Sequence, residues 1–390
     1  MKNNRRNFIK KGASLAAGIS IGSTMGATAN NMGYTNTNSP MRYNSIKDDY
    51  TKDAGMQLCL AYFAGKEPLK IKMAQQMGVH GAVGGINPRM VGMEGAMNYD
   101  LKVIKAVKEA WDDEGLKLTV IEGPPSLYTK TKLGLDGRDE EIENFITLMK
   151  NLTQVGIDTI CYNWMPLISW ARSDKAMKDR GGALVMGFDI DKIEGEPITE
   201  YGEITHEDMW NNLEYFLKAV MPEAEQLGMN LSMHGDDPPL DSIRNIPRIM
   251  TSVANFKRLI DIYPSPHNGI TWGGTFGEMG GKGQQEDLEA ALKYFTDKKV
   301  ISFVHFRNVR GYKEHFNETF IDDGQMDMAK LMQILYESGF KGPIRPDHVP
   351  TMGDDTTGFP GYTTLGTLFA IGYMRGLIDM ARGTTLTSPA

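Results

Sequence analysis

From position 56 onward, short apolar runs rich in β-branched residues alternate with longer segments whose apolar residues recur every three or four positions. The first pattern is typical of buried strands and the second of amphipathic helices. Eight runs are predicted as strands, at residues 56–63, 81–86, 117–122, 159–164, 230–234, 269–272, 300–305 and 343–346. Eight segments are predicted as helices, at residues 68–77, 99–114, 140–155, 208–227, 249–262, 284–295, 327–338 and 363–381.

This regular alternation indicates a parallel sheet, because a helix carries the chain back between successive strands. Eight strand–helix units without a second composition regime predict an α/β protein with one closed (β/α)₈ TIM barrel over residues 55–384. An open doubly wound sheet is the alternative. Residues 169–205 form an insertion after the fourth strand, which we expect over the barrel mouth, and residues 385–390 are predicted to be a short tail.

The N-terminal segment has the features of an export signal rather than of a folded domain. Arg5 and Arg6 begin a twin-arginine pattern, an apolar region rich in Gly, Ala and Ser follows, and an Ala-Thr-Ala triplet ends it at position 29. A disordered basic tail is the alternative. We therefore expect residues 1–29 to direct the protein to the periplasm by the twin-arginine route, and residues 30–54 to be a polar linker.

Composition and charge argue against several classes of partner. The 390 residues carry a formal net charge of −7 and no basic stripe, so nucleic acid is not an expected partner. After the leader no segment reaches the length of a membrane span, which predicts no membrane association for the mature chain. Cys59 and Cys161 cannot form a disulfide framework, and because each lies in an apolar run we expect two small core residues. The oligomeric state stays open, and a homo-oligomer is compatible with the sequence.

Polar side chains gather where the predicted strands end. In a (β/α)₈ barrel the active site lies at the carboxyl ends of the strands. The eighth strand runs directly into Arg345, Asp347 and His348, although burying an unpaired charge is costly. The fifth and seventh strands end in His234 and His305. We therefore expect a metal or an anionic ligand at this end of the barrel.

His234, His305 and Asp347 form the best candidate metal set. Two imidazoles and one carboxylate from separate strands suit Mn²⁺, Fe²⁺ or Zn²⁺ and leave positions open for a substrate. A single histidine is more often a hydrogen-bonded structural residue, but three polar residues at equivalent strand ends favour a metal.

Arg172, Arg307 and Arg345 lie beside these strand ends. Guanidinium groups match carboxylates in a bidentate manner, which suits an acidic substrate. The alternative is ion pairing with acidic residues of the barrel mouth, which are Glu122, Asp236 and Asp237.

His348 and Tyr362 are candidate proton-transfer residues. Histidine titrates near neutral pH, and a tyrosine beside a metal can serve as an acid or a base. Asp347 and His348 are neighbours, so a straight strand would send them to opposite faces. Both reach one site only if the strand ends at Asp347. The alternative for Tyr362 is an aromatic residue that packs at the start of the last helix.

At these positions the chain resembles the mannonate dehydratases, metal-dependent (β/α)₈ enzymes of hexuronate breakdown. The resemblance extends over residues 116–381. Its most specific segments, in order, are CYNWMP at 161–166, WAR at 170–172, HGDDPP at 234–239, NGIT at 268–271, HFR at 305–307, RPDH at 345–348 and PGY at 360–362. Chance does not produce this many separated matches in one order.

The resemblance implies a xylose-isomerase-like barrel that removes water from a sugar acid, D-mannonate, to give 2-keto-3-deoxy-D-gluconate. It implies that His234, His305 and Asp347 bind a divalent metal, Mn²⁺ first and Fe²⁺ second, and that His348 and Tyr362 transfer the protons. It further implies a set of residues that contact the substrate, which are Asn163, Arg172, Asp236, Arg307 and Arg345.

Two positions depart from the family pattern. Gly273 occupies the place of a cysteine metal ligand, two residues after Thr271, and a GGINP segment at 84–88 replaces a His-His-Ile-Pro run at the end of the second strand. Loss of a thiolate makes the predicted site harder and more open. A sugar isomerase or epimerase on the same scaffold, and a non-catalytic carbohydrate-binding relative, are therefore the alternative functions.

Overall fold

The computed structural model describes residues 55–123 and 127–383. The predicted export signal, linker and tail therefore lie outside the described residues. Within the described part, no helix is both long and apolar enough to cross a membrane.

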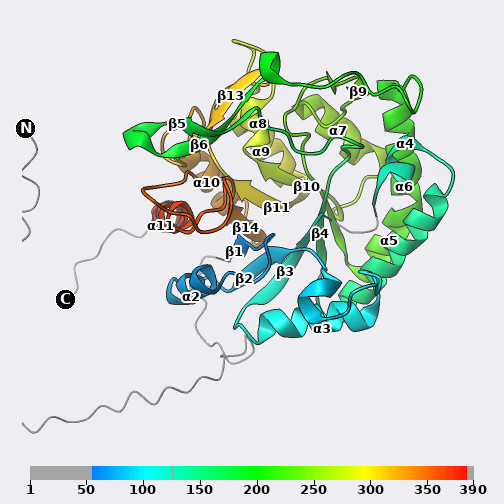
Figure 1. Cartoon of the computed structure of the whole chain (residues 1–390), viewed down its shortest axis with the longest axis horizontal. Helices are drawn as coiled ribbons and strands as arrows, with labels where there is room; N and C mark the ends of the chain where they lie inside the picture. The colour runs from blue at the N-terminus through cyan, green and yellow to red at the C-terminus, as the bar shows by residue number, and fades with distance from the viewer. Residues whose placement is uncertain (1–54, 124–126, 384–390) are drawn as a thin grey trace, which may run out of the picture. The chain divides into compact units, whose positions relative to one another are not determined.

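Eight parallel strands close into a barrel (Figure 1), which confirms the closed arrangement rather than the open sheet. The strands follow one another around the barrel in chain order, and each pairs in parallel with its two neighbours. They are β1 (Gln57–Ala61), β2 (Gly81–Gly84), β3 (Lys117–Glu122), β4 (Thr159–Tyr162), β7 (Asn230–Met233), β10 (Asn268–Gly273), β11 (Ile301–Phe306) and β14 (Pro343–Pro346).

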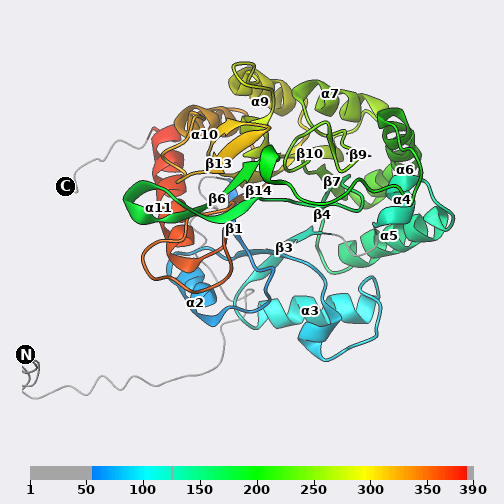
Figure 2. The same cartoon turned by 45° about the horizontal axis from the view of Figure 1, so that its top comes forward.

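The long helices lie around the outside of the barrel (Figure 2), each with an apolar face toward the strands. On α3, for example, the buried residues recur at helical spacing at Val103, Ile104, Val107 and Trp111. The helices that follow the eight barrel strands are α2 (Pro68–Gln76), α3 (Leu101–Asp112), α5 (Arg138–Thr153), α6 (His206–Leu227), α7 (Val253–Ile262), α9 (Leu288–Asp297), α10 (Met328–Glu337) and α11 (Thr364–Ala381).

Helix starts differ most from the sequence prediction, and side-chain caps explain the differences. The predicted start of α7 at 249 is wrong, because the Ser252 hydroxyl accepts a hydrogen bond from the Asn255 N–H and begins the helix at Val253. The Asp287 carboxylate caps α9 in the same way through the Ala290 N–H.

The barrel interior contains a group of buried apolar side chains. A separate buried cluster inside the strands consists of Cys59, Val83, Val120, Cys161 and Phe303. Both cysteines are therefore buried, as their apolar runs predicted. Most of the remaining apolar side chains form one continuous core between the barrel and its helices.

The predicted insertion contributes two strands to a second, antiparallel sheet. These are β5 (Asp174–Lys178) and β6 (Leu184–Asp189), and they pair with a hairpin that follows β11, made of β12 (Val309–Tyr312) and β13 (His315–Glu318). No strand was predicted at this hairpin from the sequence. Isolated bridges tie Leu184 to Thr351, and Val349 to Gly361, so this sheet is joined to the loop that follows β14.

Short elements complete the described structure. They are two short helices, α4 (Thr129–Leu133) and α8 (Thr275–Glu278), three 3₁₀ turns, η2 (Pro88–Val91), η3 (Arg180–Gly182) and η4 (Ile190–Lys192), and a ribbon of β8 (Ser242–Ile243) and β9 (Ile246–Pro247).

Candidate active site

A cavity of about 420 Å³ opens at the carboxyl ends of the barrel strands. Glu122, Cys161, His234 and Asp347 line it from four strand ends, and the insertion adds Met186. This is the position at which (β/α)₈ barrels carry their active sites, and the volume suits a small molecule.

The end of β14 brings Asp347 and His348 into the same cavity. The strand ends at Pro346, and His348 takes a left-handed backbone conformation with φ of 39°. This turn breaks the alternation that would otherwise send the two side chains to opposite faces. The Asp347 carboxylate accepts hydrogen bonds from Arg345, at 2.7 Å, and from the Tyr362 hydroxyl, at 3.2 Å.

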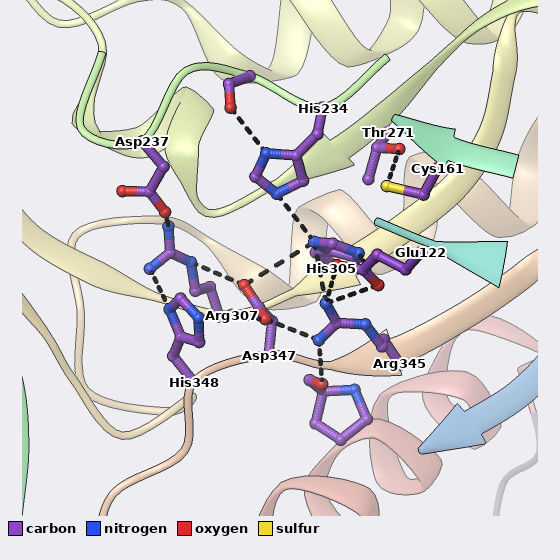
Figure 3. Close-up of polar contacts among 12 residues, drawn as sticks. Glu122, Cys161, His234, Asp237, Thr271, His305, Arg307, Arg345, Asp347 and His348 are labelled. Carbon is purple, nitrogen blue, oxygen red and sulfur yellow. Dashed lines mark hydrogen bonds and ion pairs between the residues drawn. The ribbon is translucent and has the colours of Figure 1, made fainter. Parts of the chain in front are cut away.

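The three predicted metal ligands converge (Figure 3). Nε2 of His234 lies 3.1 Å from Nδ1 of His305, which lies 3.9 Å from Oδ2 of Asp347. Nδ1 of His234 lies 2.7 Å from the carbonyl oxygen of Gly235, so Nδ1 donates and Nε2 keeps its lone pair. Burial and the positive charge of Arg345 lower the pKa of His305 to about 4, so its imidazole is neutral at neutral pH. Neutral imidazoles and a carboxylate are ligands that fit a divalent cation.

Glu122 and Arg345 form an ion pair at the same level. Nη2 of Arg345 lies 3.0 and 3.1 Å from the two carboxylate oxygens of Glu122. Burial alone would raise the pKa of Glu122, but the charge of Arg345 and the neighbouring His305 lower it to about 2. Glu122 is therefore an anion at the cavity wall.

Arg172 and Arg307 lie in a buried ionic cluster rather than in the cavity lining. Arg172 donates to Asp237 at 2.5 and 2.9 Å, and Arg307 donates to the same carboxylate at 3.0 Å. Glu318 accepts from both guanidinium groups, and Glu278 lies 2.9 Å from Arg307. The structure thus favours ion pairing, the alternative that the sequence left open, over direct contact of Arg172 and Arg307 with a substrate.

Asp236, a predicted substrate-binding residue, does not line the cavity. Its carboxylate turns toward the chain after β9 and accepts a hydrogen bond from the Met250 N–H at 2.8 Å. Burial raises the pKa of Asp236. The next residue, Asp237, lines the cavity instead.

Asn163 and Arg345 are the predicted substrate contacts that do line the cavity. Oδ1 of Asn163 accepts hydrogen bonds from Nζ of Lys132 at 2.9 Å and from the Met165 N–H at 3.1 Å. These two donors fix the amide, so that its NH₂ group remains as a donor for a ligand.

His348 and Tyr362, the predicted proton-transfer pair, lie side by side in the lining. Their ring centroids are 5.4 Å apart in an edge-to-face arrangement, and Trp170 contacts His348 in the same geometry. Nδ1 of His348 lies 2.5 Å from Oε1 of Glu318. Burial, followed by the charge of Asp347, raises the pKa of Tyr362, so the phenol keeps its proton.

Sequence reasoning missed Glu318 and Glu278. Glu318 ends the alternating run His315–Glu318, which is only a weak strand signal. Glu278 lies on the short α8 helix, outside the sequence motifs described above.

Polar groups that meet in a cavity at the carboxyl ends of a closed parallel barrel define a (β/α)₈ barrel protein with an enzyme-like site. The sequence model of the family described as D-mannonate dehydratase (UxuA) matches residues 56–200 and 195–386. The mannonate dehydratase of Streptococcus uberis is 32% identical over 358 residues, which cover 83% of this chain and 98% of that protein. The chain therefore belongs to the D-mannonate dehydratase family.

Solved structures agree with this assignment. The crystal structure of the mannonate dehydratase from Streptococcus suis serotype 2 matches with a TM-score of 0.76 at 30% identity, over 86% of this chain and 96% of that chain. A xylose isomerase domain protein from Alicyclobacillus acidocaldarius matches with a TM-score of 0.52 at 15% identity, over 84% of this chain and 100% of that chain. The second match shows the fold alone and confirms the xylose-isomerase-like barrel.

Proposed function

We propose that this chain is a hydro-lyase that removes water from a sugar acid, with D-mannonate as the leading substrate, in a reaction that depends on a divalent metal. The observation that carries the proposal is the convergence of His234, His305 and Asp347 beside His348 and Tyr362 in one cavity. Membership of the D-mannonate dehydratase family supports the reaction class.

His234, His305 and Asp347 would hold the metal, for which we propose Mn²⁺ or Fe²⁺. When bound, the cation would stabilise the negative charge that develops on the substrate's carboxylate as the neighbouring proton leaves. Asp347 is held in place by hydrogen bonds from Arg345 and Tyr362, so its carboxylate needs little reorganisation to act as a ligand.

His348 is the proposed base. With the Glu318 carboxylate 2.5 Å from Nδ1, the favoured tautomer carries its proton on Nδ1 and leaves Nε2 as the basic nitrogen. Nε2 would take the proton from the carbon next to the substrate's carboxylate. The anionic Glu318 would then stabilise the imidazolium that forms.

Tyr362 is the proposed acid. It keeps its phenolic proton because burial and the charge of Asp347 raise its pKa. That proton would pass to the hydroxyl on the next carbon of the substrate, which leaves as water while a carbon–carbon double bond forms. The enol product then converts to the keto acid in solution.

Arg345 and Lys175 are the proposed partners of the substrate's negative charge, because both are cations that line the cavity. Asn163 would contact a sugar hydroxyl through its amide NH₂ group. Arg172 and Arg307 would act indirectly, by fixing Asp237 and Glu318.

The test is an assay of the full chain, stripped of metal and then supplied with Mn²⁺ or Fe²⁺, with D-mannonate as the substrate. We expect metal-dependent formation of 2-keto-3-deoxy-D-gluconate. An isomer of the starting acid as the product would instead indicate an isomerase or epimerase. Absence of any product although metal is bound would refute the proposal for this substrate.

Two variants test the proton-transfer pair. His348→Gln and Tyr362→Phe should each lower kcat by about 10²–10⁴-fold at saturating metal, because each removes a general acid or base while the three metal ligands remain. Tyr128→Phe is the matched control, because Tyr128 is 54% exposed and lies outside the cavity lining. Unchanged kcat in both His348→Gln and Tyr362→Phe would remove the pair from the mechanism.

A further inference from the structure

His305 presents its two ring nitrogens to different surroundings. Nδ1 faces His234 and Asp347, the ligand set described above. Nε2 is buried and has no hydrogen-bond partner among the described residues. The nearest acidic oxygen, Oε2 of Glu122, lies 3.4 Å from it. A buried ring nitrogen without a hydrogen-bond partner is unfavourable. In the tautomer that carries its proton on Nδ1, Nε2 has a lone pair that a cation on this side would satisfy.

A cysteine completes the surroundings of Nε2. Glu122, Cys161 and His305 each offer one ligand atom, and these three atoms all lie within 4.8 Å of one another. The three side chains come from three separate strands, β3, β4 and β11. Glu122 and Cys161 are paired in register, so both side chains leave the barrel wall on the same side (Figure 3). Gly273, in register with His305 on β10, contributes no ligand atom to this level.

The Cys161 sulfur has a polar neighbour, although burial raises the pKa of its thiol. Its hydrogen-bonding neighbour is the Thr271 hydroxyl at 3.3 Å, which is itself 2.9 Å from the Ser232 hydroxyl. The Thr271 hydroxyl can donate to a thiolate and orient it, as outer partners of metal ligands do, and the Ser232 hydroxyl in turn fixes Thr271. Cys161 also lines the cavity, so a cation can reach it from the barrel mouth.

We propose that Glu122, Cys161 and Nε2 of His305 form a second cation position, which prefers a thiophilic divalent ion such as Zn²⁺ or Co²⁺. One oxygen, one sulfur and one nitrogen donor match the ligand preference of such ions, while Mn²⁺ prefers oxygen-rich surroundings. Because the two positions share a single imidazole, a cation at one competes with a cation at the other. The site does not depend on the proposed dehydration, because it is defined by binding.

Cobalt provides a readout that is independent of activity. The metal-stripped full chain is titrated with Co²⁺, and the near-ultraviolet absorption of a sulfur-to-cobalt charge transfer is recorded. We expect this band to appear in the unmodified chain and to be absent from Cys161→Ser, with Co²⁺ affinity at least about tenfold weaker. Cys59→Ser is the matched control, because Cys59 is buried in the same interior cluster, and it should keep the band.

Two further variants separate the two positions. Glu122→Gln should keep the band but weaken Co²⁺ affinity by about tenfold, because an anionic ligand is lost. Asp347→Asn should keep the band, because Asp347 belongs to the other position. Titration of the unmodified chain with Cd²⁺ should give the corresponding sulfur-to-cadmium charge-transfer band. This measurement needs no substitution, so it does not depend on whether a variant folds.

Three results would contradict the proposed second cation position. Tight Co²⁺ binding without a sulfur band in the unmodified chain would overturn the proposal. So would a band that survives in Cys161→Ser, or one that disappears in Asp347→Asn. These outcomes are separate from the dehydratase assay, since a chain that fails to convert D-mannonate can still show the band.

Discussion

The carboxylate of Glu318, on β13, lies 2.5 Å from Nδ1 of His348, on the loop that follows β14. This contact links a hairpin outside the barrel to a candidate base inside the cavity. Glu318 also accepts hydrogen bonds from Arg172 and Arg307, so three cationic or polar partners fix its position. The hairpin therefore serves the site, although none of its residues lines the cavity.

Glu318→Gln is expected to lower kcat by about tenfold or more with little change in KM, because it removes the group that selects the tautomer of His348. A purely structural role would not produce this separation of kcat from KM. Glu318→Asp should recover part of kcat.

The control is Glu289→Gln, on the first turn of α9. Steady-state kinetics below the unfolding temperature of each variant provide the measurement, and an equal rise in KM would contradict the positioning role.

Asp237→Asn is expected to lower the free energy of unfolding by about 3–5 kcal/mol, because it leaves the buried guanidinium groups of Arg172 and Arg307 without a full counter-charge. The side chains of Arg172 and Asp237 are 0% and 1% exposed. Asp322→Asn is the matched control, since Asp322 pairs with Arg180 at 3.0 Å on the surface. The control should cost less than about 1 kcal/mol. Urea denaturation of both variants measures the difference, and equal losses would show that the buried cluster is not stabilising.

The low pKa of His305 predicts a pH dependence of stability in the metal-free protein. Burial and the charge of Arg345 lower this pKa from 6.5 to about 4 in the folded chain, so between these values the unfolded chain binds the extra proton. Stability should therefore fall as pH decreases from 6.5 to 4, with a contribution from His305 of roughly 3 kcal/mol.

Denaturation at pH 7 and at pH 4.5 tests this dependence. His305→Gln should show a smaller loss of stability on acidification than the unmodified chain. His206→Gln, at the exposed start of α6, is the control and should show the full loss. An identical pH dependence in His305→Gln and the unmodified chain would rule out the buried neutral imidazole as its source.

Export by the twin-arginine route remains a prediction, because the segment that carries Arg5 and Arg6 lies outside the described residues. Replacing both Arg5 and Arg6 by Lys is expected to hold the full chain in the cytoplasm of a Gram-negative host, since that route reads the arginine pair. Lys10→Arg combined with Lys11→Arg preserves the charge and should not affect export. Cell fractionation followed by immunoblotting gives the distribution. Periplasmic recovery of the double-lysine variant would argue against the twin-arginine route.

The sequence by itself determined the barrel fold and the end of the barrel at which the site lies. Eight apolar runs and eight amphipathic segments correspond to the eight barrel strands and their helices, because periodicity reports burial directly. The carboxyl ends of parallel strands meet at one end of a barrel. Residues at the ends of strands that are far apart in the sequence, such as His234, His305 and Asp347, could therefore be predicted to lie close together from the sequence alone.

Only the tertiary structure decided which polar side chains face the cavity and which neutralise one another. Asp236 and Asp237 are adjacent and chemically alike, yet one binds a backbone N–H and the other two arginines. Arg172 and Glu318 are 146 positions apart. Such pairings depend on packing between loops, which no periodicity encodes. The closeness of Cys161 to His305 has a different origin, because closure of the barrel brings side chains of β4 and β11 together in its interior.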